Sequence, residues 1–170
     1  GKSFKVELSM GRESAFSLLG LPERFSLSDE EIDRAWRERI ALVHPDRFAA
    51  LGDAAKRVAE QWAGRLNDAK GELTNPVTRA KALLAARGID LAEETDTRMP
   101  QDFLLRQFTW RERAQDGEKD AVLLELRASE DSCLKALGEA LDEKKDFPRA
   151  RELARELLFL RKLAADLVSS

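Results

Sequence analysis

Apolar side chains recur every three or four residues along most of this chain, the spacing of one face of an α-helix. In the first half the pattern predicts a short helix over 13–19 and two longer helices on either side of position 44. The two longer apolar stripes are Ile32, Ala35, Trp36, Ile40 and Val43, and then Ala55, Val58, Ala59, Trp62, Leu66, Ala69 and Leu73. We expect the two long helices to be antiparallel, joined by a short loop, and closed by the small first helix.

Helix boundaries are marked by capping residues. Ser28 and Glu31 have the spacing of a capping box at the start of the second helix. Gly20 follows the first helix, where a left-handed residue commonly ends one. Asn75 and Pro76 have the residue types of an N-cap and a first helical position, so they predict a further short helix ending at Gly88.

The second half contains three more helical patterns, near 100–115, 119–143 and 148–168. Two of their stripes are Val122, Leu126, Cys133, Leu137 and Leu141, and then Leu153, Leu157, Leu160, Ala164 and Leu167. Three long helices with short loops favour a three-helix bundle. Residues 88–99 are polar and weakly periodic. We therefore predict an all-α protein with a hairpin domain over 12–76, a short helix and connection over 77–99, and a bundle over 100–170.

The composition of the chain excludes several classes of function. The chain is 43% hydrophobic and 36% charged, with a net charge of -3, which does not favour a nucleic-acid binder. Its single cysteine, Cys133, excludes an intrachain disulfide and a cysteine-based zinc site, and lies on an apolar stripe as a small core residue would. No apolar run approaches the length of about 18 residues that spans a membrane, and no signal peptide is visible, so we expect a cytosolic protein.

The only histidine stands in the tripeptide His44-Pro45-Asp46, between the two long helices of the hairpin. Pro45 disfavours a helical conformation at residue 44, so the preceding helix should end there. One interpretation is a helix stop with a polar turn. A catalytic role for His44 is weaker, since a general base needs a partnered histidine in a pocket and no nucleophile motif accompanies it.

With its flanking helices, this tripeptide resembles that of a J-domain, together with Ile32, Trp36 and Asn67. The resemblance covers about the first 75 residues and implies that His44, Pro45 and Asp46 contact a heat-shock-70 class chaperone and trigger its ATP hydrolysis. A helical wheel places Arg34 and Arg37 away from the apolar stripe, and Arg47 extends this charge after the tripeptide. Such a basic face suits an acidic partner, although a solvated helix face is the plainer interpretation. Arg39 stands where J-domains usually have a leucine.

From about residue 13 to the end, the chain resembles the HscB family, co-chaperones of iron–sulfur cluster assembly. The matching strings are FSLLGLP at 16–22, HPDRFA at 44–49, NP at 75–76, RA at 79–80, LL at 83–84, GIDL at 88–91, and FLL at 103–105 with Gln107, Phe108, Arg111 and Glu112. The resemblance implies two partners, an HscA-type chaperone and the IscU-type scaffold on which clusters are assembled. It implies no cofactor, no metal site, and no chemistry by the protein itself.

The predicted helix near 100–115 has more apolar surface than one buried stripe needs. Phe103, Gln107, Trp110 and Ala114 share a face, and Leu104, Leu105 and Phe108 lie beside it. In the last helix Leu158 and Phe159 are similarly in surplus. This surplus suits a partner-binding patch, or else a thicker core or packing on the first domain. In the HscB family the corresponding positions dock the scaffold, which implies contacts by Leu104, Leu105, Phe108 and Phe159, with Glu112 as a polar rim. Thr109 stands where relatives tend to have an acidic residue.

The sequence therefore predicts a bacterial, cytoplasmic co-chaperone that delivers an IscU-type scaffold to an HscA-type chaperone and stimulates its ATPase, with no nucleic-acid or membrane partner and with room for weak self-association. Two alternatives stay open. The J-domain could serve a different client, or the chain could be a non-catalytic helical scaffold in which the tripeptide is fortuitous.

Overall fold

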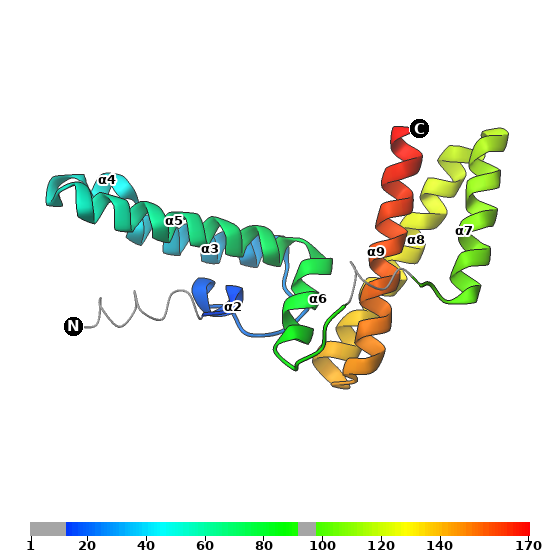
Figure 1. Cartoon of the computed structure of the whole chain (residues 1–170), viewed down its shortest axis with the longest axis horizontal. Coiled ribbons are helices and arrows are strands. Elements are labelled where there is room, and N and C mark those ends of the chain that lie inside the picture. The colour runs from blue at the N-terminus through cyan, green and yellow to red at the C-terminus, as the bar shows by residue number, and fades with distance from the viewer. Residues whose placement is uncertain (1–12, 92–97) are drawn as a thin grey trace. The chain divides into compact units, whose positions relative to one another are not determined.

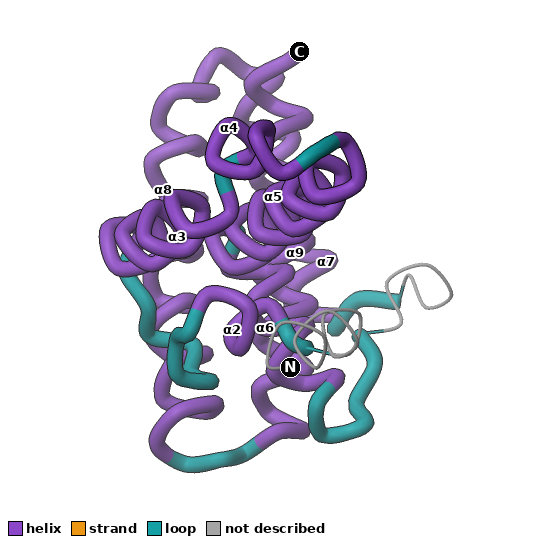
Figure 2. Tube along the Cα trace, turned by 90° about the vertical axis from the view of Figure 1, so that its left-hand side faces the viewer, coloured by secondary structure: helices purple, strands orange, loops and turns teal. Residues whose placement is uncertain are grey.

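The computed structural model describes residues 13–91 and 98–170, except the side chain of Pro45, and this part of the chain is helical, without strands. Figure 2 shows helices joined by loops throughout these ranges. The prediction of an all-α protein is confirmed. The chain divides into two compact units between Ala82 and Leu83. Within the described ranges, no helix is both long and apolar enough to cross a membrane.

The helices follow one another as Figure 1 labels them. The first unit contains α2 (Ala15–Leu19), α3 (Asp29–Val43), α4 (Pro45–Phe48), the 3-10 turn η2 (Ala49–Leu51) and α5 (Asp53–Thr74). Helix α6 (Pro76–Ala85) crosses the division. The second unit contains α7 (Gln101–Arg113), the π-helical turn η3 (Ala114–Glu118), α8 (Lys119–Gly138), the π-helical turn η4 (Glu139–Glu143) and α9 (Phe147–Ser169).

Side chains cap the helices of the first unit where the sequence predicts it. Ser28 accepts a hydrogen bond from the Glu31 backbone N–H at 3.1 Å, which satisfies a donor in the first turn of α3. The Asn75 side chain accepts from the Val77 N–H at 2.9 Å at the start of α6. Gly20 ends α2 with a φ of 68°. A Cβ at Gly20 would also lie 2.5 Å from Nη2 of Arg39, so this arginine packs its guanidinium against the glycine.

Helices α3 and α5 pair along their lengths, and α2 packs against α5. The buried side chains of this core include Phe16, Leu19, Phe25, Leu27, Ile32, Ala59, Leu66, Ala69 and Leu73. Trp36 and Ile40, from the predicted α3 stripe, are half-buried. The pairing of the two predicted stripes is the physical basis of the hairpin, since each amphipathic helix needs a second one to cover its apolar face.

The junction after α3 differs from the short loop that the sequence suggested. Helix α3 ends at Val43, as the proline rule requires, but α4 and η2 follow at once and both pack against α5. Proline is well suited to the first position of α4, because its missing N–H would have no partner there. The residues after His44 are therefore fixed in helical turns.

In the second unit α8 and α9 form the main pair, and α7 lies against both. Their predicted stripes are buried: Val122, Leu126, Cys133, Leu137 and Leu141 on one side, and Leu153, Leu157, Leu160 and Leu167 on the other. Leu163 is buried as well, whereas Ala164 is half-buried. The three-helix bundle is confirmed. The predicted helix over 119–143 is α-helical only to Gly138, where η4 continues it.

The polar stretch 88–99, expected to be a connection, is described only in part, and 92–97 lie outside the described residues. Residue 12, the expected start of the first domain, also lies outside them. Within this stretch, Leu91 is fully buried. The second unit begins at Leu83, so it includes residues that the sequence assigned to a connection.

Candidate functional site

The His44 side chain both caps a helix and faces solvent. Its Nδ1 accepts a hydrogen bond from the Asp46 backbone N–H at 3.2 Å, as the N-cap of α4. A neutral imidazole that accepts at Nδ1 carries its proton on Nε2. The His44 side chain is 54% exposed and that of Asp46 is 89% exposed. The capping hydrogen bond of α4 thus holds His44 beside Asp46, and both the imidazole and the carboxylate face solvent.

The three arginines predicted to form a basic face lie along one side of α3 or at its end. Arg34 and Arg37 are exposed on the side away from the buried Ile32. Arg47 donates from Nη1 to the backbone oxygen of Ala41 at 2.9 Å, which brings its guanidinium back to the end of α3. The helical spacing places Ala41 on the same face as Arg34 and Arg37. These positive charges therefore form one row that leads to the tripeptide.

Asp33, which was not among the predicted site residues, restrains this basic row. Its Oδ2 is 2.6 Å from Nη2 of Arg37, and its Oδ1 is 3.1 Å from Nζ of Lys70 on α5. The hydrogen bond from Lys70, with the charges of Arg37 and Lys70, lowers the pKa of Asp33 below its ordinary value of 3.8. The four-residue spacing of Asp33 and Arg37 was a usable signal for their pairing. Nothing in the sequence placed Lys70 beside them.

An exposed apolar patch lies on α7. Leu104 is 48% exposed, Leu105 62% and Phe108 64%, whereas Phe103 and Trp110 on the same helix are buried. Glu112, one turn after Phe108, is also exposed. At 100° per residue these four exposed positions fall within one arc of the helix. We call Leu104, Leu105, Phe108 and Glu112 the α7 patch.

Phe159 does not belong to the exposed surface, and the prediction that placed it there is wrong. It is only 8% exposed, and its ring centroid is 5.9 Å from that of Phe103. The surplus apolar positions of α9 are therefore used in packing: Phe159 supports α7 from beneath, and Leu158 is half-buried. Helical periodicity could not show this, because the packing of α7 on α9 widens the buried arc of α9.

Salt bridges and hydrogen bonds attach α7 to the rest of the bundle. Arg106 reaches Glu156 on α9 at 3.4 Å and Ser129 on α8 at 3.2 Å. Arg111 pairs with Asp166 of α9 at 3.3 Å. At the far end, Arg113 lies 2.6 Å from Glu125 and 3.4 Å from Glu118, and these two carboxylates raise its pKa. The helix that carries the patch is thereby fixed on its inner side.

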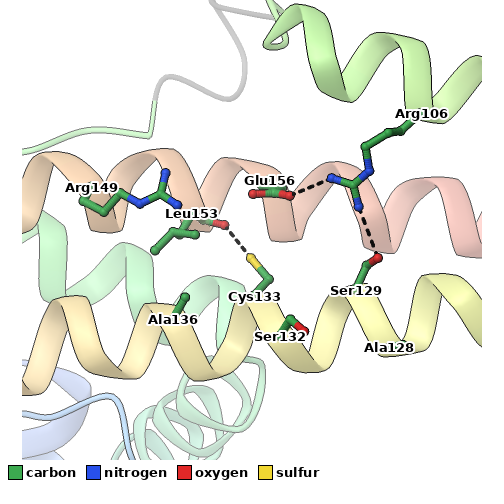
Figure 3. A pocket seen from close by; sticks show the side chains of 9 residues that line it. All are labelled: Arg106, Ala128, Ser129, Ser132, Cys133, Ala136, Arg149, Leu153 and Glu156. Carbon is green, nitrogen blue, oxygen red and sulfur yellow. Dashed lines mark hydrogen bonds and ion pairs between the residues drawn. The ribbon is translucent and has the colours of Figure 1, made fainter.

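An open hollow of about 420 Å³ lies between α7, α8 and α9, and Figure 3 shows the side chains that line it. Arg106, Glu156 and Cys133 are among its lining residues. The Cys133 thiol donates to the Leu153 carbonyl oxygen at 3.2 Å, and burial raises its pKa to about 12. A thiol with that pKa stays protonated at neutral pH, so it is a poor nucleophile and a poor metal ligand. Within 13–91 and 98–170, no three His, Cys, Asp or Glu side chains come together as metal ligands.

A family model described as the HSCB C-terminal oligomerisation domain matches residues 99–168. The chain is 44% identical over 163 residues to the co-chaperone protein HscB homolog of Burkholderia thailandensis, covering 92% of this chain and 93% of that protein. The homolog of Bordetella pertussis is 40% identical over 163 residues, covering 93% and 96%.

Two solved structures share the fold. Chaperone HscB from Vibrio cholerae superposes with a TM-score of 0.77 at 26% identity, over 92% of this chain and 96% of that one. Human co-chaperone protein HscB superposes with a TM-score of 0.81 at 24% identity, over 91% and 80%. The helical fold is common to this chain and both solved structures, and the sequence similarity to the bacterial relatives runs through both units. This chain belongs to the HscB family of co-chaperones.

Proposed function

We propose that this protein delivers an IscU-type scaffold to an HscA-type chaperone and stimulates the chaperone's ATPase. One observation carries the proposal: the side chains of His44 and Asp46 face outward at the end of a row of arginines, a surface built for contact rather than for catalysis. In this proposal residues 12–76 act as the J-domain, 77–99 as short helix and connection, and 100–170 as the scaffold-binding bundle.

On the chaperone side, His44, Pro45 and Asp46 make the specific contacts, and Arg34, Arg37 and Arg47 steer an acidic surface toward them. Charges at the edge of an interface mainly raise the association rate of the two proteins and make that rate dependent on salt. Asp33 is expected to restrict the movement of Arg37, because its Oδ2 lies 2.6 Å from Nη2 of the guanidinium. The protein itself acts as a regulator of a partner's ATPase and is not the enzyme.

On the scaffold side, the α7 patch supplies the apolar contacts and Glu112 its polar edge. Three large apolar side chains exposed on one arc form the kind of patch that marks a protein-binding surface. Phe159 is left out of the contact surface because it is buried.

Carrying both surfaces on one chain raises the effective concentration of the scaffold beside the chaperone without any additional contact. The protein then needs only modest affinity for each partner. The bacterial relatives support a site of action in the bacterial cytoplasm as part of this proposal.

The test is a steady-state ATPase assay of a purified HscA-type chaperone with the full chain, with and without an IscU-type scaffold. We expect the chain to stimulate hydrolysis, more strongly with the scaffold present, and His44→Gln to lose the stimulation while still binding the scaffold. Leu124→Ala, which changes an exposed leucine on α8, serves as the matched control and should behave as wild type. Stimulation that survives His44→Gln would refute the chaperone-contact assignment.

A second candidate is self-association of the bundle, because residues 99–168 match the HSCB C-terminal oligomerisation domain. Light scattering over a range of concentrations tests it directly. A mass that rises with concentration supports it, and a constant monomer mass rules it out.

A further inference from the structure

Arg155 of α9 is buried, with 7% of its surface exposed. Its guanidinium donates to two backbone carbonyl oxygens, from Nη1 to Leu91 and from Nη2 to Arg98, the second at 3.2 Å. The planar guanidinium presents several donors in a fixed geometry, so it can hold two acceptors at once. Arg155 therefore fixes two chain positions that are seven residues apart in the numbering.

Arg98 lies just before α7. Pro100 is the N-cap residue of α7, and no side chain caps this helix. Proline fixes its own φ and restricts the residue before it, Met99. A fixed Arg98 carbonyl thus leaves little freedom to the two residues that lead into the first turn of α7.

The same guanidinium also touches the support beneath α7. It lies 5.5 Å from the ring centroid of Phe159, and Phe159 packs on Phe103 in the first turn of α7. Leu104 and Leu105 of the α7 patch follow Phe103 directly. Arg155 therefore acts on the start of α7 twice, through the Arg98 backbone and through the Phe159–Phe103 ring pair.

We infer that Arg155 is a positioning residue for scaffold binding: it fixes the start of α7 so that the α7 patch is held in one geometry. The inference rests on the proposed function of that patch. Burying a guanidinium costs desolvation energy that an apolar side chain would avoid. The guanidinium offsets this cost by binding the two carbonyl oxygens with two separate nitrogens of one rigid fork, which an apolar side chain cannot do.

The chain provides a matched control one helical turn away. Arg151 donates to the backbone oxygens of Asp90 at 2.8 Å and Leu91 at 3.4 Å, on the near side of the connection only. Arg151→Met makes the same chemical change as Arg155→Met without touching Arg98. It separates fixing the start of α7 from fixing the connection in general.

The first measurement is hydrogen exchange of the full chain. In Arg155→Met we expect the amides of the first turns of α7 to exchange about tenfold faster, because a charge-assisted hydrogen bond is lost, while those of α8 are unchanged. In Arg151→Met the α7 amides should exchange as in wild type. Faster exchange spread equally over α7, α8 and α9 would mean a purely structural role and would overturn the inference.

The second measurement is the affinity for a purified IscU-type scaffold, read as a double-mutant cycle with Phe108→Ala. We expect Arg155→Met to raise Kd about tenfold and Phe108→Ala to cost less in that background than in wild type, since a mispositioned patch no longer uses Phe108 fully. A loss of stability alone would leave the Phe108→Ala effect unchanged. If Arg155→Met folds poorly, Arg155→Lys keeps the charge but has one nitrogen in place of the planar fork whose two nitrogens bind the two carbonyl oxygens, and the same results are expected.

The outcomes separate the two proposals. Unchanged affinity in Arg155→Met, while Phe108→Ala weakens binding, overturns the positioning role and leaves the proposed function standing. Equal effects of Arg155→Met and Arg151→Met also overturn it. No effect of Phe108→Ala removes the α7 patch as the scaffold surface, and the inference with it.

Discussion

Trp36 donates its indole N–H to the side-chain oxygen of Asn67 at 2.9 Å, joining α3 to α5. The Lys70 ammonium lies 4.1 Å from the centroid of the same indole and 3.1 Å from Asp33. A polar strip therefore runs along the edge of an otherwise apolar helix pair. It links the packing of the hairpin to Arg37, the partner of Asp33 in the basic row.

Asn67→Leu is expected to destabilise the first unit by about 1 kcal/mol, because the indole N–H of the half-buried Trp36 loses its acceptor. The change is measured by urea denaturation in a Trp110→Phe background, where fluorescence comes from Trp36 and Trp62 in the first unit alone. Asp68→Ala alters the exposed neighbour and is the control. Equal stability of the two variants would show that the hydrogen bond contributes nothing.

Asp33 should give the first unit a specific sensitivity to acid. Its pKa is lowered in the folded state, mainly by the hydrogen bond from Lys70, so its stabilising effect is complete above its ordinary value of 3.8 and is lost as the pH falls through the lower folded-state value. Asp33→Asn should therefore be less stable than wild type at neutral pH, and the difference should shrink below that value. A difference that stays constant from neutral pH to acid would contradict the assignment.

Leu105→Ala and Phe108→Ala should each weaken scaffold binding by about 1–3 kcal/mol without lowering the melting temperature. Both side chains are more than half exposed, so truncating them leaves no cavity in the core. Calorimetric titration with the scaffold checks the affinity. Leu124→Ala, at 69% exposure on α8, should change neither quantity. If Leu124→Ala weakens binding equally, the surface is not specific to α7.

Cys133 should resist thiol reagents in the folded protein. Burial raises its pKa from 9.0 to about 12, which lowers the thiolate fraction at neutral pH by about a thousandfold before restricted access is considered. Ellman's reagent should react slowly with native protein and quickly in denaturant. Fast reaction under native conditions would mean that the α8–α9 pair opens readily around this residue.

The helices were predictable because a helix that buries one face has apolar residues at helical spacing along its own sequence. The stripes of α8 and α9 are largely buried, whereas that of α3 is buried at Ile32 and otherwise half-buried, and that of α5 is part buried and part half-buried. Ser28 and Asn75 mark where their helices begin. The end of α3 at Val43 followed from a local rule, since Pro45 disfavours a helical conformation at His44, whereas α4 was not predicted. Contacts across helices left no comparable signal. Lys70 beside Asp33 and Arg155 beneath Arg98 join residues far apart in sequence, and only the fold brings them together.

Phe159 was predicted to contact the scaffold, but the structure places it beneath α7. A substitution at Phe159 distinguishes a residue that supports α7 from one that contacts the scaffold. Its burial against Phe103 predicts that Phe159→Ala destabilises the second unit by about 3–5 kcal/mol, the usual cost of emptying a buried aromatic site. The loss of scaffold affinity should then accompany the loss of stability, whereas Phe108→Ala should lose affinity alone. Thermal unfolding and calorimetric titration of the same samples give both quantities. Phe159→Leu, which refills most of the space, should recover much of both. A Phe159→Ala variant as stable as wild type but unable to bind the scaffold would return this ring to the contact surface.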